Sequence, residues 1–406
     1  MSELDEDQLR VLDLINNNKN VLLVGMAGTG KSRIISELKE NTTKHVYITS
    51  TTGVSALNIS GVTLHSFLGI GLGDGTKEEL FLKVVKNYPL KKILSNPSTL
   101  IVIDEVSMLG VSLFEKIDYI FKKLRYNNKP FGGIQLLLSG DFLQLEPIND
   151  DTIYKHSLID NFEIVQLTRN YRQKGDDTYQ KLLSNLRYNE LTDEDISLLK
   201  SKAKDVCKDE NPVRIFTTNA AVNAYNAKHT QNNKEKEYVY KAVYKGSNKY
   251  YTNDIQKQFK AKNIDILSLK KNLKVMLTKN LDIKIGLVNG SLGTITDFVG
   301  GLPKVKFNNG VTQVIEPATW EMLLDNKIVA SAKQIPLVIA YALTVHKCQG
   351  LTLNSAVIDL KNSFAPHMIY VALSRVKNLD NLTLLNFNEN KININEETKE
   401  FYKKLG

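Results

Sequence analysis

The sequence predicts an α/β protein with two parallel sheets and a small antiparallel barrel inserted in its second half. Short apolar runs that alternate with helical patterns are typical of parallel, doubly wound sheets. In the first half these runs lie at 21–25, 45–49, 100–103 and 134–138. A second series lies at 213–216, 274–278, 337–343, 356–359 and 382–387. With 406 residues the chain is too long for a single core, so two or three domains are expected.

The expected helices follow from the spacing of apolar residues. An amphipathic helix is predicted over 4–16, before the first strand. After that strand, Ile34, Ile35 and Leu38 define the inner face of a second helix. Residues 177–203 are also helical and amphipathic. A basic helix is expected through Lys83, Lys86, Lys91 and Lys92. Its charged face could contact a polyanion or could simply be solvated.

The pattern changes between 285 and 335. The dipeptides Asn289-Gly290, Gly300-Gly301 and Asn309-Gly310 are turn signals, and short strand-like runs flank them. Hairpin signals at such close spacing predict the small antiparallel barrel. The preceding segment, 229–272, is polar and rich in Lys, Asn and Tyr, and its pattern assigns no clear element.

Composition limits the class of protein. The chain has 53 Lys+Arg against 44 Asp+Glu, a formal charge of +9, which suits a polyanionic partner but is also common on solvated surfaces. Cys207 and Cys348 have no metal-site spacing and favour a reducing, intracellular compartment. Nucleus, cytoplasm and viral replication site all stay open. No apolar run approaches membrane-spanning length, and the acidic first residues resemble neither a signal nor a transit peptide.

The stretch Gly25–Ser32 fits G-x-x-x-x-G-K-[ST], the phosphate-binding loop. It lies between a predicted strand and a predicted helix, which is the context that this motif requires. Glycines let successive backbone N–H groups converge, and the helix N-terminus adds positive potential. Lys31 would reach the β- and γ-phosphates of ATP, and the Ser32 hydroxyl would hold Mg²⁺. The candidate nucleotide-binding residues are Gly25, Met26, Ala27, Gly28, Thr29, Gly30, Lys31 and Ser32.

Further polar groups follow two other apolar runs. Asp104 and Glu105 end the run at 101–103, where open α/β sheets bind ligands. Asp104 would hold Mg²⁺ through water, and Glu105 would polarise the attacking water. Gln144 follows the run near 138 and could contact a γ-phosphate oxygen, or could be an ordinary loop residue bonded to backbone.

Two arginines are candidates for stabilising transferred phosphate. Arg172 and Arg375 could act as arginine fingers from the same chain, although single arginines more often form surface ion pairs. Gln8 precedes the phosphate-binding loop, and its amide could pair with an adenine edge.

The order of these motifs resembles the PIF (petite integration frequency) family of superfamily 1B DNA helicases, and more distantly the RecD-like helicases. The resemblance is dense over 4–175 and 273–387. The matching stretches are Gln8, Gly25–Ser32, Thr49–Asn58, Thr63–Phe67, Asp104-Glu105, Leu113–Arg125, Phe131–Gln135, Gly140–Gln144, Arg172, Leu287–Gly293, Leu343–Thr352 and Tyr370–Arg375. Met26 and Glu146 depart from the family pattern without removing a catalytic group.

The resemblance implies two RecA-like P-loop NTPase domains, the first at 1–178 and the second at 179–285 with 336–406. It also implies an SH3-like barrel at 286–335 and a small wedge insertion at about 66–97. The implied activity is ATP-driven, Mg²⁺-dependent translocation on single-stranded DNA in the 5′-to-3′ direction. Forked duplex would be unwound by a monomer during DNA replication, recombination or repair, or at telomeres.

The resemblance also implies further contact residues. Gln349 and Gly350 would touch the nucleotide. The DNA-contact candidates are Thr51, Thr52, His65, Ser66, Phe67, Thr344, His346 and Lys347. Short donors suit phosphate contacts and Phe67 suits base stacking. His65 and His346 could equally be buried core histidines.

Two other functions remain open from the sequence. A nucleotide-gated DNA-binding switch would hydrolyse ATP slowly without unwinding DNA. A kinase would share the phosphate-binding loop but should lack the second α/β domain that carries Arg375.

Overall fold

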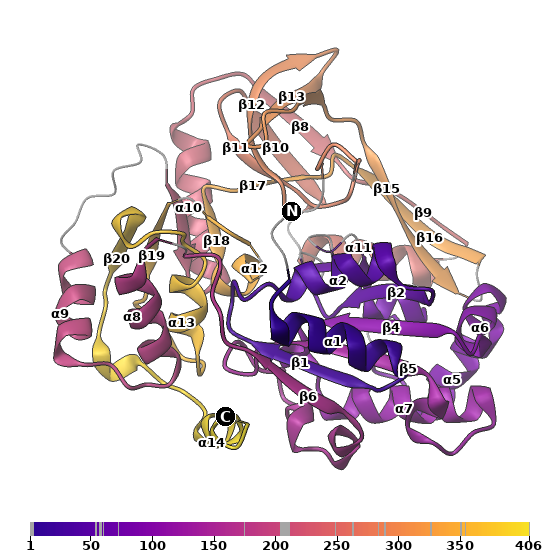
Figure 1. Cartoon of the computed structure of the whole chain (residues 1–406). Helices are drawn as coiled ribbons and strands as arrows, with labels where there is room; N and C mark the ends of the chain where they lie inside the picture. Colours follow the sequence, from indigo (N-terminus) through magenta and orange to yellow (C-terminus); the bar gives the residue numbers. More distant parts are fainter. Residues whose placement is uncertain are drawn as a thin grey trace. The chain divides into compact units, whose positions relative to one another are not determined.

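The computed structural model of the chain describes a defined set of residues and divides them into two compact units. The described residues are 4–52, 55–56, 59, 61–71, 73–173, 175–203, 212–247, 249–261, 264–282, 284–287, 290–324, 327–349, 351–353 and 355–405. The first unit comprises Met1–Thr217 with Val345–Gly406, and the second Thr218–Thr344 (Figure 1). No helix among the described residues has the length and apolar character needed to span a membrane.

A six-stranded parallel sheet forms the centre of the first unit. Its strand order is β3-β2-β4-β5-β1-β6. The bounds are β1 Val21–Gly25, β2 His45–Ser50, β3 Val62–Thr63, β4 Thr99–Asp104, β5 Gln135–Gly140 and β6 Glu163–Leu167. The four strands predicted in this half are therefore confirmed. All four are rich in apolar residues, as is usual for parallel strands with both faces covered.

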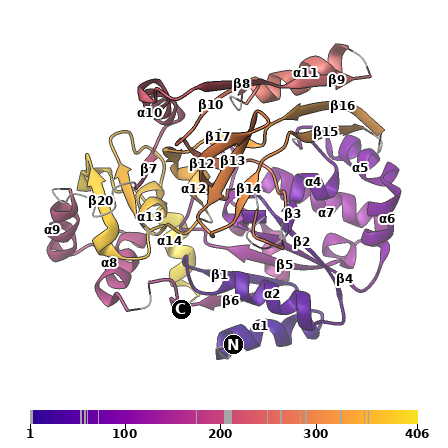
Figure 2. The same cartoon turned by 90° about the horizontal axis from the view of Figure 1, so that it is seen from above.

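Helices cover this sheet. They are α1 Glu6–Asn16, α2 Lys31–Asn41, α4 Leu64–Leu68, α5 Lys77–Lys86, α6 Tyr88–Ser95 and α7 Val111–Arg125 (Figure 2). The single basic helix predicted through Lys83 and Lys92 is wrong, because the chain breaks there into α5 and α6. The cause is local: the Asn87 side chain accepts the Leu90 N–H as an N-cap, and Pro89 lies in the first turn of α6.

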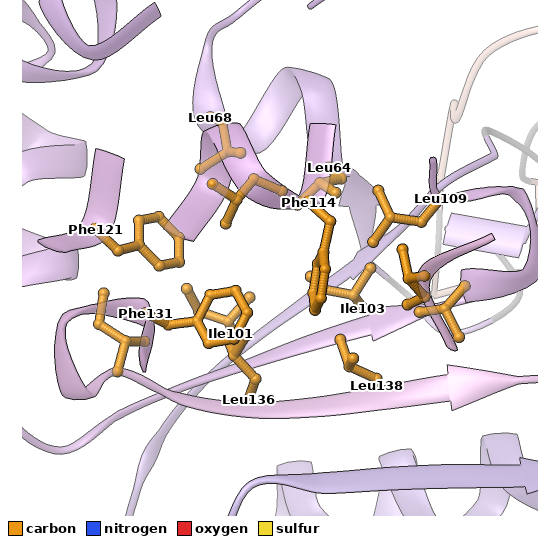
Figure 3. Close-up of a cluster of buried hydrophobic side chains, with 14 of the residues drawn as sticks. Leu64, Leu68, Ile101, Ile103, Leu109, Phe114, Phe121, Phe131, Leu136 and Leu138 are labelled. Atoms are coloured by element: carbon orange, nitrogen blue, oxygen red, sulfur yellow. The ribbon is translucent and has the colours of Figure 1, made fainter. Parts of the chain in front are cut away.

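Two apolar cores pack on this sheet. One contains residues of α1 and α2, including Val11, Ile15 and Ile34. On the other, the rings of Phe114, Phe121 and Phe131 lie over side chains of β4 and β5 (Figure 3). Since all three rings are at most 1% exposed, this aromatic layer fixes α7 against the strands that carry the acidic residues.

The first unit contains a second set of parallel strands. β7 (Val213–Phe216), β19 (Ala356–Asp359) and β20 (Leu382–Leu385) pair in that order, as predicted. The accompanying helices are α8 Asp177–Arg187, α9 Asp193–Lys202, α12 Val345–Cys348, α13 Met368–Leu373 and α14 Glu396–Lys403. Tyr402 of α14 belongs to the same apolar core as Phe114, so the last helix packs on the six-stranded sheet.

The second unit is mainly antiparallel. A five-stranded sheet has the order β14-β13-β12-β11-β17, and a three-stranded sheet the order β15-β16-β9. The strands are β8 Glu237–Lys241, β9 Val243–Gly246, β10 Ile266–Lys270, β11 Lys274–Leu277, β12 Leu292–Val299, β13 Leu302–Phe307, β14 Thr312–Val314, β15 Ala318–Leu324, β16 Lys327–Gln334, β17 Leu337–Ile339 and β18 Ala342–Thr344. The helices are α10 Asn219–Asn232 and α11 Lys249–Ala261.

The antiparallel pattern predicted from the turn signals is confirmed, but it begins earlier in the chain, at β8. The strands expected at 274–278 and at the start of 337–343 do not continue the second parallel series. They form β11 and β17, which pair with each other in antiparallel orientation. A short apolar run does not reveal the direction of its partner, which explains the error.

Candidate functional site

The phosphate-binding loop joins β1 to α2 with two glycines in left-handed conformation, Gly28 at φ +90° and Gly30 at φ +91°. A Cβ on Gly28 would lie 2.5 Å from the Cβ of Arg172, so both backbone angle and space require glycine. The Lys31 ammonium donates to the carbonyls of Gly25 (2.5 Å) and Met26 (3.0 Å). Burial lowers the pKa of Lys31, while the carboxylates of Asp141, Glu105 and Asp104 act in the opposite direction.

The other residues of the loop differ in their exposure to solvent. Ala27 and Thr29 are buried, and the Thr29 hydroxyl donates to the Met26 carbonyl. Ser32 is exposed in the first turn of α2. Gln8 is buried, and its side-chain nitrogen lies 2.6 Å from where a Cβ on Gly30 would stand. The structure therefore brings the predicted adenine-reading amide beside the loop.

Asp104 is the last residue of β4 and Glu105 directly follows it, both near Lys31 of the loop. The Ser139 hydroxyl donates to Asp104 Oδ1 (2.7 Å). Burial and the neighbouring Glu105 raise the pKa of Asp104 to about 7. Glu105 has a left-handed backbone (φ 54°, ψ 44°), unusual for a residue with a side chain. Its Oε2 accepts a hydrogen bond from the Gln349 amide at 3.3 Å, which joins a predicted nucleotide contact to a predicted catalytic carboxylate.

One arginine contacts Gln144, and a second lies beside that arginine. The Arg375 guanidinium donates to Gln144 Oε1 (3.0 Å) and to the Val371 carbonyl (2.9 Å). Arg172 donates to the Ser374 carbonyl (3.1 Å), and burial together with nearby Arg375 lowers its pKa to about 10. In the described part of the chain, neither arginine forms an ion pair with a carboxylate. A buried and a half-buried guanidinium close together favour an anion between them.

Several DNA-contact candidates of the first unit contact neighbouring residues of the protein. The hydroxyls of Thr51 and Thr52 donate to the Glu105 carbonyl (2.7 Å) and to Ser55 Oγ (2.9 Å). Phe67 packs against Tyr47, with ring centroids 5.7 Å apart. Ser66 bonds to the α4 cap residue, through Thr63 Oγ1 donating to Ser66 Oγ (2.8 Å).

Two candidate histidines are half-buried, and burial lowers the pKa of both His65 and His346. Lys347 is exposed beside His346. Thr344 is buried and belongs to the second unit. Gly350 and parts of the 49–58 stretch lie outside the described residues. DNA contact by these side chains stays a prediction.

Sequence reasoning missed a buried ion pair beside this site. Asp141 and Arg187 approach within 2.7 Å, and both are nearly inaccessible to solvent. The hydroxyl of Tyr402 donates to the same carboxylate. Asp141 lies in the recognised Gly140–Gln144 stretch, but its partners lie 46 and 261 residues away. No local pattern signals such a pairing.

A phosphate-binding loop, two acidic residues on a nearby parallel strand and a pair of arginines define a nucleotide-binding protein of the P-loop class. The model of the PIF1-like helicase family matches residues 3–192, and that of the Pif1 helicase 2B domain matches 251–298. The ATP-dependent DNA helicase PIF1 of Danio rerio is 34% identical over 99% of this chain and 64% of its own length.

Solved structures agree. The Pif1 helicase of Candida albicans has a TM-score of 0.90 at 33% identity and covers 100% of both chains. The Bacteroides Pif1 helicase, in complex with ADP-AlF3 and ssDNA, has a TM-score of 0.77 at 27% identity over 100% of this chain and 97% of that one. This chain belongs to the PIF1-like helicase family. It spans about 64% of the length of the first curated relatives it matches.

Proposed function

We propose that the chain is an ATP-dependent DNA helicase that moves 5′-to-3′ on single-stranded DNA and unwinds forked duplex. The observation that carries this proposal is the pair Arg172 and Arg375. Arg375 is buried, Arg172 is partly buried, and neither has a carboxylate partner among the described residues. Arg172 lies against Gly28 of the phosphate-binding loop, and Arg375 lies near Arg172. An arginine that meets the γ-phosphate during transfer contributes on the order of 10³–10⁵ in rate.

The other residues take roles that their surroundings support. Lys31 would exchange its bonds to loop carbonyls for the β- and γ-phosphates. Ser32 and Asp104 would hold Mg²⁺ with the nucleotide. No cluster of three or more metal-ligating side chains occurs in the described residues, which suits Mg²⁺ because it keeps water and phosphate oxygens as ligands. The raised pKa of Asp104 means that a cation would displace its proton.

Water activation and phosphate sensing complete the proposed chemistry. Glu105 would orient the attacking water, with Gln349 fixing its carboxylate through the 3.3 Å hydrogen bond. Gln144 would contact the γ-phosphate and lose that contact on hydrolysis. Because Gln144 is bonded to Arg375, the nucleotide state would reach both the turn after β5 and the segment that follows α13. One solved structure of a related Pif1 helicase is bound to ssDNA, and another concerns DNA unwinding at forked dsDNA, which supports DNA as the track.

The test combines two measurements on the whole chain. ATP hydrolysis is measured with and without single-stranded DNA, and displacement of a labelled oligonucleotide is measured from duplexes with a 5′ or a 3′ tail. We expect strong stimulation by DNA and displacement from the 5′-tailed duplex alone. DNA binding without stimulation would instead identify a nucleotide-gated switch. Displacement from the 3′-tailed duplex would overturn the direction.

A further inference from the structure

The buried carboxylate of Asp141 is the centre of a polar network that the proposed chemistry does not use. Arg187 of α8 donates to both its oxygens, at 2.7 and 3.3 Å. The Tyr402 hydroxyl donates to Oδ1 (3.0 Å) and the Tyr370 hydroxyl to Oδ2 (3.4 Å). Burial alone would raise the pKa of Asp141, but Arg187 reverses this and the pKa is lowered. The carboxylate is therefore charged and held from three helices.

This carboxylate shapes the turn that presents Gln144. The Leu143 N–H donates to Asp141 Oδ1 (3.2 Å), and the Gln144 N–H donates to the Asp141 carbonyl (2.9 Å). The Phe142 N–H donates to the Tyr402 hydroxyl (3.1 Å). Each of the three residues after Asp141 thus has its N–H fixed by Asp141 or by Tyr402.

The same network reaches the arginine that faces Gln144. Tyr370 lies on α13, and the chain reaches Arg375 directly after that helix. One carboxylate therefore connects the Gln144 turn with the helix leading to Arg375.

The C-terminal helix α14 is part of this network and is independently fastened. Tyr154 O–H and Thr398 Oγ1 are bonded at 3.0 Å, and the Asn395 amide donates to Glu146 (2.7 Å). The Arg187 guanidinium lies 4.5 Å from the Tyr402 ring centroid. Helix α14 would therefore stay docked if the Tyr402 hydroxyl alone were lost.

We propose that Tyr402, with Arg187 and Asp141, is a positioning group for ATP hydrolysis. The three side chains hold the turn that carries Gln144, so that the Gln144–Arg375 pair faces the γ-phosphate. The inference rests on the proposed function. Tyr402 does not touch the nucleotide in this account. Its hydroxyl acts by fixing Phe142 N–H and the Asp141 carboxylate, so the C-terminal helix takes part in catalysis from outside the nucleotide site.

The test compares Y402F with the matched control Y154F in the full chain. Each substitution removes one hydroxyl that bonds at the interface with α14, but only Tyr402 bonds to Asp141. We expect Y402F to lower kcat for DNA-stimulated ATP hydrolysis by about tenfold or more, since small misplacement of reacting groups is costly, and to leave KM for ATP within about twofold. Y154F should retain the wild-type kcat.

A second readout does not depend on turnover. ADP with aluminium fluoride mimics the transferred phosphate, so Y402F should bind it more weakly than wild type does while binding ADP alone equally well. Equal losses of kcat and of affinity for ADP–aluminium fluoride in Y402F and Y154F would overturn the positioning role. The absence of any such loss in Y402F would overturn it as well. A wild-type chain that hydrolyses no ATP would overturn the proposed function, and the ADP–aluminium fluoride comparison would still decide this inference.

Discussion

The Arg375 guanidinium donates to the side-chain oxygen of Gln144 across 3.0 Å, although 231 residues separate the two in the chain. Both side chains are at most 2% exposed. If the two side chains act as one unit on the γ-phosphate, the losses of activity caused by substituting each of them are not additive in free energy. We expect R375K and Q144A each to lower kcat by on the order of 10²–10³ and the double variant to be little worse. Steady-state ATPase assays of the four proteins measure this coupling, and strictly multiplicative losses would contradict it.

The Lys31 ammonium is the most direct phosphate contact expected. K31A should abolish ATP hydrolysis, because no other side chain of the loop carries a positive charge to the β- and γ-phosphates. DNA binding should stay measurable, since the DNA-contact candidates lie on other elements. Hydrolysis is followed with excess DNA, and binding by fluorescence anisotropy of a labelled oligonucleotide. K39A, on the exposed face of the same helix, is the control. Undiminished turnover in K31A would remove the loop from the mechanism.

His367 predicts a pH dependence of stability. Its Nε2 accepts the Asn395 N–H, and burial lowers its pKa from 6.5 to about 4. Between these pH values the unfolded chain binds a proton at His367 and the native chain does not. The contribution of neutral His367 to the free energy of unfolding is therefore complete above pH 6.5 and is lost as the pH falls to 4. The loss is about 3 kcal/mol.

The comparison variant is H367N, because asparagine tolerates the left-handed backbone at this position (φ 60°). Denaturant unfolding at several pH values gives the difference in free energy of unfolding between wild type and variant. As the pH falls from 6.5 to 4, the wild type should lose stability relative to the variant, because only the wild type carries a histidine at this position. A constant difference would show that His367 is not held neutral.

Phe114 tests the aromatic layer beneath α7. It is fully buried, and its ring centroid lies 5.1 Å from that of Phe131. F114A should lower the free energy of unfolding by about 3–5 kcal/mol through lost burial and a cavity. F364A, at a side chain that is 67% exposed, should change it by about 0.5 kcal/mol or less. Denaturant titration measures both, and equal effects would contradict the packing described.

The sequence allowed prediction of those features that depend on neighbouring residues. The strands of the six-stranded sheet are short apolar runs, and the loop at Gly28 and Gly30 has a local signature. The order of motifs then linked Arg375 to the loop. What failed depended on distant partners or on one capping residue. The direction of β11 is set by β17, the Asp141–Arg187 pair joins the turn after β5 to α8, and Asn87 divides the basic segment into two helices.

The left-handed backbone at Glu105 limits how this position can be studied. A residue branched at Cβ would be strained there whatever its chemistry, at a cost of about 1–3 kcal/mol. In a saturation library, valine, isoleucine and threonine would therefore score as inactive because they distort the end of β4. Glutamine, which keeps the length of the side chain and removes only its charge, separates the chemical role of the carboxylate from the shape of the turn that carries it.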